Sequence, residues 1–243
     1  MNKKLQEDLN ELENIIQNAN HINANKQLEL IQKIAETGEE GQEILINILI
    51  ERKNIKINEL KLLDGILFEI LNKTQLETIR KKMEQHFQYG LINLQHPLNL
   101  EYQPLQTLLI SQKFQEADKL TQSQLCKLAG LTENHRQWLY FTDIANLPIQ
   151  DLEIIDILWR IYSRGKFGFS IQRKIWLSYN GNWEKLWNKI GWKKQGVLCR
   201  YPNEFIWHIN APIGHLPLFN QLRGTQVLVA LFKHIAWNQK IYS

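Results

Sequence analysis

Aromatic and cationic side chains alternate in one irregular stretch of the chain, residues 191–208. Glycine and proline keep this stretch out of regular structure, and its large rings and cations are Trp192, Tyr201, Phe205, Trp207, Lys193, Lys194 and Arg200. Irregular segments longer than about 15 residues are usually functional or disordered, and disordered segments are poor in aromatic residues. Flat rings with Lys and Arg suit a planar, apolar ligand edged by carboxylates. A loop that binds another protein would have much the same composition, so the residues by themselves leave both interpretations open.

Two histidines near this stretch, His208 and His215, could face a metal centre in such a ligand. A single histidine in a loop rich in proline and glycine is more often hydrogen-bonded within the protein, and we favour that role for both. The only cysteines, Cys126 and Cys199, form neither a disulfide framework nor a zinc motif. We therefore expect no metal site.

Catalytic motifs are absent or accidental. There is no phosphate-binding loop, dinucleotide fingerprint, zinc-protease motif or serine-hydrolase elbow. Ser163 and Lys166 have the spacing of a penicillin-binding motif without its companion motifs. Asp151 and Glu153 fall at the start of a helix expected after Pro148, where the helix dipole accounts for carboxylates without catalysis. We expect no enzyme activity.

The elements that position the irregular stretch are helical. The first ninety residues contain neither tryptophan nor proline and carry apolar side chains at helical spacing, for example Leu5, Leu9, Leu12 and Ile16. Short connections predict antiparallel packing, so we expect an N-terminal helical bundle, HEAT-like, over residues 1–90.

Residues 91–103 are the expected linker, and residues 104–243 the expected core domain. Pro104 is placed to begin a helix, and a second helix follows from Pro148 to Gly165. Apolar residues cover most of the circumference of the latter, which predicts a central buried position. The predicted fold class is therefore all-α: an N-terminal bundle and a C-terminal helical core with a long irregular loop.

Charge and composition restrict the classes of partner that we expect. The net charge of +4 is mild and lacks the dense basic patch of a nucleic-acid-binding protein, so we expect no nucleic acid. No apolar run reaches the length of a membrane span, and the first residues resemble neither a secretory signal nor a transit peptide.

Five motifs occur in order within the second half: residues 136–142, residues 151–159, residues 165–172, residues 190–193, and residues 214–217 with residues 220–224. In this order and spacing they closely resemble the genomes-uncoupled-four family of oxygenic phototrophs, over roughly residues 105–237. The N-terminal half resembles the extra bundle of cyanobacterial and red-algal plastid members.

The resemblance implies a helical core, shaped like a cupped hand, that binds protoporphyrin IX and magnesium protoporphyrin IX as ligands and requires no cofactor. Family members stimulate magnesium chelatase by acting with its large porphyrin-binding subunit, and they perform no chemistry themselves. We accordingly expect a monomeric regulator, with peripheral membrane association also considered. Its compartment would be the plastid stroma or the cyanobacterial cytoplasm, and the strong use of Asn, Ile and Lys favours plastid-encoded. A helical adaptor without a tetrapyrrole ligand is the alternative.

The resemblance also implies site residues. Arg223 matches an arginine suited to pairing with a porphyrin propionate, since arginine offers two parallel donors to a carboxylate. Gln226 stands where some relatives carry a second arginine, and Arg200 or Lys193 are candidates to compensate. The expected porphyrin-binding residues are Phe141, Tyr201, Phe205, Trp207, Asn220 and Arg223.

Overall fold

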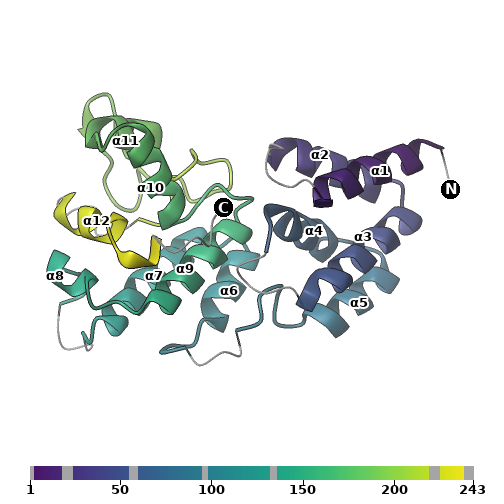
Figure 1. Ribbon diagram of the computed structural model, residues 1–243, viewed down its shortest axis with the longest axis horizontal. Coiled ribbons are helices and arrows are strands. Elements are labelled where there is room, and N and C mark those ends of the chain that lie inside the picture. Colours follow the sequence, from purple (N-terminus) through teal and green to yellow (C-terminus); the bar gives the residue numbers. More distant parts are fainter. Residues whose placement is uncertain are drawn as a thin grey trace. The chain divides into compact units, whose positions relative to one another are not determined.

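The computed structural model describes residues 3–17, 24–54, 60–94, 98–131, 136–218 and 225–237. Within these ranges the chain is mostly helical, so the predicted fold class is confirmed (Figure 1). The chain divides into two compact units, Met1–Asn93 and Leu94–Ser243. No helix of the described ranges is both long and apolar enough to cross a membrane.

The N-terminal unit consists of short helices in sequence: α1 (Lys3–Gln17), α2 (Ala24–Ala35), α3 (Glu39–Glu51), the 3-10 turn η1 (Arg52–Asn54), α4 (Leu62–Asn72) and α5 (Glu77–Phe87). Their apolar stripes meet in one core, in which Leu12, Ile31 and Leu67 are fully buried. Gly41 lets α3 approach α2 closely, because a Cβ atom there would lie 2.1 Å from the carbonyl oxygen of Ile34.

The C-terminal unit is built from α6 (Gln103–Ile110), α7 (Phe114–Leu128), α8 (Phe141–Ile144), α9 (Ile149–Ile161), α10 (Phe169–Ser178), α11 (Trp183–Lys189), α12 (Thr225–Phe232) and the 3-10 turn η4 (Ile235–Trp237). Its centre is aromatic. Phe114 of α7, Trp159 of α9 and Phe167 are fully buried. Their ring centroids lie 5.3–6.5 Å apart in stacked and edge-on pairs.

Helix α9 occupies the buried position predicted for it, and two of its aspartates are fully buried. Asp151 accepts hydrogen bonds from the Tyr102 hydroxyl at 2.7 Å and from the side-chain amide of Asn99 at 2.7 Å. The structure therefore gives Asp151 a larger role than a surface interaction with the helix dipole: it joins α9 to the segment that leads into α6.

The irregular stretch is more ordered than its composition predicts, because it contains a small antiparallel hairpin. Strand β1 (Lys193–Lys194) pairs with β2 (Val197–Leu198), with Lys193 opposite Leu198. The turn residues Gln195 and Gly196 both have positive φ, 49° and 83°, as a tight hairpin turn with two central residues requires.

Candidate functional site

The loop from Gly191 to Leu218 is held by a bond between its own two ends and by bonds from α10. The Trp192 indole N–H donates to the carbonyl of His215 at 2.7 Å. The Gln172 side-chain amide donates to the carbonyls of Gly214 at 3.0 Å and Pro217 at 2.8 Å. These bonds hold the base of the loop and leave its aromatic tip to be positioned by ring contacts.

Three of the predicted porphyrin-binding residues are brought together in this loop. The Trp207 ring lies edge-on to Tyr201, with centroids 5.9 Å apart, and tilted against Phe205 at 6.3 Å. Phe205 is 5% exposed and also contacts His215, whereas Tyr201 is 42% exposed. The cluster therefore has a buried base and a partly exposed edge. We refer to Tyr201, Phe205 and Trp207 as the loop aromatic cluster.

His215 is a structural histidine. Its Nδ1 lies 2.6 Å from the carbonyl oxygen of Ile190, and its Nε2 accepts the Ile206 amide at 3.0 Å. Because one ring nitrogen faces an acceptor and the other a donor, the neutral form protonated on Nδ1 satisfies both contacts. Burial lowers the pKa of His215, in keeping with a neutral ring. Neither nitrogen is available to a metal, and His215 instead ties the end of α11 to the loop aromatic cluster.

His208 is exposed, and its Nδ1 accepts the amide of Asn210 at 3.2 Å. His208 is thus hydrogen-bonded within the protein, which is the role favoured for it from the sequence. The described part of the chain also contains no group of three or more His, Cys, Asp or Glu side chains that could hold a metal ion.

The cations proposed for propionates differ in their surroundings. Lys193 Nζ is 2.6 Å from both carboxylate oxygens of Glu184, so a ligand would have to displace this ion pair. Arg200 is exposed, and its backbone amide donates to the Glu204 carboxylate at 2.8 Å. Arg200 therefore offers the more accessible charge of the two.

An open pocket of about 610 Å³ adjoins the loop aromatic cluster. It is bounded by the hairpin on one side and by residues 203–206 on the other, and its lining residues are Lys194, Gln195, Val197, Asn203, Glu204, Phe205 and Ile206. Its lining combines the apolar Val197, Phe205 and Ile206 with polar and charged side chains.

Phe141 begins the short helix α8 and is 52% exposed, beside the equally exposed Tyr140. Within the described residues, no ring contact joins Phe141 to the loop aromatic cluster. Helix α8 instead packs against α12. The structure therefore places the predicted aromatic residues in two groups.

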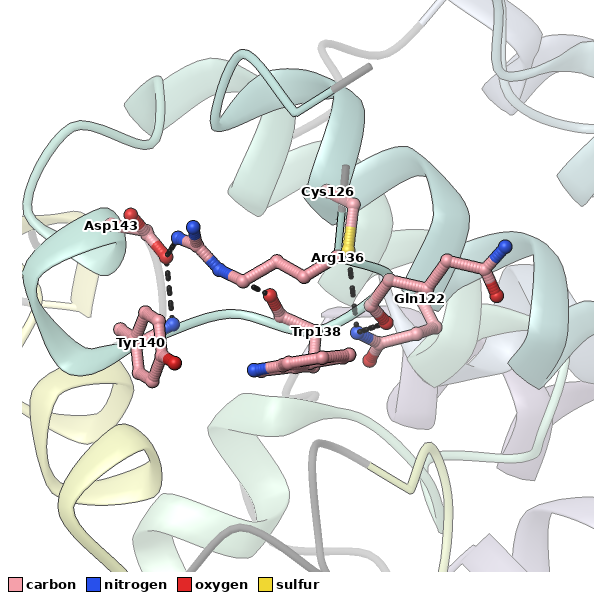
Figure 2. A network of polar contacts seen from close by, with 7 residues as sticks. Gln122, Cys126, Arg136, Trp138, Tyr140 and Asp143 are labelled. Carbon is pink, nitrogen blue, oxygen red and sulfur yellow. Dashed lines mark hydrogen bonds and ion pairs between the residues drawn. The ribbon is translucent and has the colours of Figure 1, made fainter. Parts of the chain in front are cut away.

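An ion pair between Arg136 and Asp143 fixes the segment that leads into α8 (Figure 2). The Asp143 carboxylate also accepts the backbone amide of Tyr140 at 2.7 Å, and the Arg136 guanidinium lies 4.4 Å from the centre of the Tyr140 ring. Burial acts to raise the pKa of Asp143, but the hydrogen bonds from Arg136 and Tyr140 outweigh it, and the pKa is lowered. This network holds the exposed Tyr140 ring in a defined place, next to Phe141 in the sequence.

Asn220 and Arg223 lie outside the described residues. Gln226 lies on α12 and is exposed.

Other side chains near these groups were not predicted from the sequence. Trp176 and Trp183 are partly exposed and contact each other at 5.2 Å, and both pack against Phe232 of α12. Trp159, Trp192 and Trp237 are buried in the core, whereas these two are not. A second unpredicted residue is Asp118, whose spacing of four from Phe114 and seven from Leu125 places a carboxyl on the buried face of α7.

Comparisons with known proteins show the family to which the chain belongs. Residues 95–235 match the model of the GUN4-like family, and residues 2–88 match the model of an ARM-like repeat domain, GUN4-N terminal. The chain belongs to the GUN4 family. The first match contains all of the predicted porphyrin-binding residues, and the second agrees with the HEAT-like bundle expected in the N-terminal half.

Relatives within the family come from cyanobacteria and plastids. The chain is 44% identical over 214 residues to the Ycf53-like protein of Synechocystis sp., covering 88% of this chain and 91% of that one. It is 44% identical over 242 residues to ycf53 of Porphyra purpurea, covering 98% and 99%. It is 37% identical over 142 residues to the tetrapyrrole-binding protein, chloroplastic, of Arabidopsis thaliana, covering 55% and 54%.

The fold is also similar to a solved structure. GUN4 from Chlamydomonas reinhardtii superposes with a TM-score of 0.56 at 35% identity, covering 61% of this chain and 95% of that one.

Proposed function

We propose that this GUN4-family chain binds protoporphyrin IX and magnesium protoporphyrin IX and stimulates magnesium chelatase, without catalysing a reaction itself. The observation that carries the proposal is the loop aromatic cluster, whose buried base and partly exposed edge suit a flat macrocycle. The Arabidopsis relative is a tetrapyrrole-binding protein, and its similarity supports the same class of ligand here.

The physical basis of binding is burial of a large apolar face. At about 25 cal/mol per Å² of apolar surface removed from water, covering one face of a porphyrin is worth several kcal/mol, less the cost of ordering the loop. We propose that Phe141, Tyr201, Phe205 and Trp207 contact the ring. Asn220 and Arg223, with Arg200 or Lys193, are the proposed contacts at its polar edge.

The proposed setting is the plastid stroma or the cyanobacterial cytoplasm, with the large porphyrin-binding subunit of magnesium chelatase as partner and the chain acting as a monomer. A titration tests the ligand: a water-soluble dicarboxylic porphyrin should shift its Soret band and quench tryptophan fluorescence on adding the protein. No response at micromolar porphyrin would overturn the proposal and favour an adaptor that binds other proteins without a tetrapyrrole.

The charge at residue 223 provides a specific prediction. Arg223→Glu should raise the porphyrin Kd about 10- to 100-fold, because a charge-assisted bond worth roughly 1.5–3 kcal/mol is replaced by repulsion. Lys174→Glu is the matched control, since it makes the same charge change at an exposed position of α10. Equal affinities in the two variants would remove Arg223 from the site.

The two units allow a second prediction. Residues 94–243 alone should bind the porphyrin with an affinity similar to that of the full chain, since a GUN4 structure from Chlamydomonas corresponds to only 61% of this chain. A magnesium chelatase assay with both proteins then measures what the N-terminal unit adds. Loss of porphyrin binding in the shorter protein would contradict the assignment of the site to the C-terminal unit.

A further inference from the structure

Asp118 is a carboxyl group on the buried face of α7, 4% exposed and close to the fully buried Ala117 and the nearly buried Thr121. An ionised carboxylate is costly to bury unless it is paired. Burial raises the pKa of Asp118 to about 8, against smaller lowering effects of the Leu218 amide and the Lys119 charge. Burial therefore favours the protonated form of Asp118 up to a higher pH than for an exposed aspartic acid.

The side chain of Asp118 holds the end of the loop. Its Oδ1 accepts the backbone amide of Leu218 at 2.6 Å, a contact between residues 100 positions apart. Leu218 immediately precedes the sequence that contains Asn220 and Arg223. Asp118 thus fixes the last described residue before that sequence.

The same stretch of α7 also holds the tip of the loop. The Tyr201 phenol lies close to the Gln115 side chain, which stands three residues before Asp118 and therefore on the same face of α7. Burial, and then the nearby Asp118 charge, raise the pKa of the Tyr201 phenol. One turn of α7 consequently lies against both Tyr201 and Leu218, which are 17 residues apart in the loop.

We propose that Asp118 is a positioning residue for the tetrapyrrole site, whose side chain on α7 fixes Leu218 and the Tyr201 end of the loop aromatic cluster together. This inference rests on the proposed function, because Tyr201 is assigned to the ligand and Leu218 precedes the proposed contacts Asn220 and Arg223 in the sequence. The groups that face Asp118 are Lys119 from its own helix, the Tyr201 phenol from the loop and the Leu218 amide. Lys119 is exposed to solvent, so we expect ionised Asp118 to be stabilised by water and not by Lys119. Water can reach Asp118 only if the Tyr201 end of the loop moves away from α7.

The first test needs no ligand. In the full-length protein, the amide resonance of Leu218 should shift with pH between 6 and 9, with a midpoint near 8, the pKa of Asp118. Asp118→Asn, which keeps the shape and the acceptor of the neutral acid, should abolish this step. A step that persists in Asp118→Asn, or no step in the original chain, would overturn the proposal.

The second test is the porphyrin titration at several pH values. With a pKa of about 8, the neutral fraction of Asp118 falls from about 0.9 at pH 7 to about 0.1 at pH 9, so the apparent affinity should fall about tenfold. In Asp118→Asn the affinity should be constant over this range, because the amide cannot ionise. Asp118→Ala should bind at least about fivefold more weakly than Asp118→Asn at pH 7, since it loses the acceptor for Leu218.

The outcomes separate the two proposals. Porphyrin binding with the same pH profile in Asp118→Asn and the original chain would sink the role of Asp118 and leave the proposed function standing. Absence of porphyrin binding at every pH, together with the Leu218 step, would sink the proposed function and leave Asp118 as the group that positions the loop. If Asp118→Asn does not fold, the midpoint of the Leu218 step in the original chain still decides, because a midpoint far from 8 contradicts the assignment.

Discussion

Replacing Asp156 by alanine is expected to lower the free energy of unfolding of the C-terminal unit by about 3–5 kcal/mol. Asp156 is fully buried in α9 and accepts three hydrogen bonds: from the Ser170 amide at 2.8 Å, the Ser170 hydroxyl at 2.7 Å and the Arg160 Nε at 2.9 Å. Gly168 makes this arrangement possible, since a Cβ atom there would come within 2.9 Å of the Asp156 carboxylate. Alanine would remove the buried acceptor of the Ser170 amide and hydroxyl at the start of α10, together with the carboxylate contact of Arg160.

The tryptophans make the C-terminal unit measurable by itself, because all eight lie between residues 138 and 237. Denaturant unfolding of the full chain followed by tryptophan fluorescence therefore reports this unit. Glu184→Ala is the matched control: it removes a carboxylate whose side chain is 60% exposed, and such a pair is worth less than about 1 kcal/mol. If both variants lost a similar amount of unfolding free energy, burial would not account for the contribution of Asp156 to stability.

The sequence predicts the helices well because their apolar residues recur every three or four positions, which places them on one face of a helix. The stripe around Leu12 and the circumferential burial of α9 both depend on local periodicity alone, and both are found in the structure. The hairpin of β1 and β2 was not predicted, since two residue pairs are too short to produce an alternating pattern. Gln195–Gly196 was its only signal, a turn marked by one glycine.

The sequence predicted the candidate site only through the composition of the loop and through the family motifs. The clustering of Tyr201, Phe205 and Trp207 follows from their proximity in the chain, and ring contacts confirm it. The contacts of Asp118 with Leu218 and of Gln115 with Tyr201 join residues far apart in sequence, and no local pattern encodes such pairs. The structural role of His215 likewise depends on Ile190, 25 positions away. For Phe141 the sequence went further than the structure. Its motif resembles that of the family, but its association with the loop aromatic cluster stays a prediction.

Removing the largest ring of the loop aromatic cluster is expected to have the strongest effect on the proposed ligand. Trp207→Ala should raise the porphyrin Kd by about 10- to 100-fold, or roughly 1.4–2.8 kcal/mol, because stacking area is lost and both neighbouring rings lose their support. Trp207 contacts Tyr201 on one side and Phe205 on the other, and its indole N–H donates to the Pro202 carbonyl at 3.0 Å. It therefore shapes the loop as well as its surface.

Two variants separate ring area from loop shape. Trp207→Phe keeps a flat ring but loses the bond to Pro202, so it should retain most of the affinity if contact with the macrocycle dominates. Leu177→Ala removes an apolar side chain that is 48% exposed on α10 and should bind like the original chain. Equal weakening in Trp207→Phe and Trp207→Ala would assign the effect to the Pro202 bond and to loop shape. Unchanged affinity in Trp207→Ala would exclude the loop aromatic cluster as the porphyrin platform, and the exposed pair Tyr140 and Phe141 would then be the aromatic surface to test by the same titration.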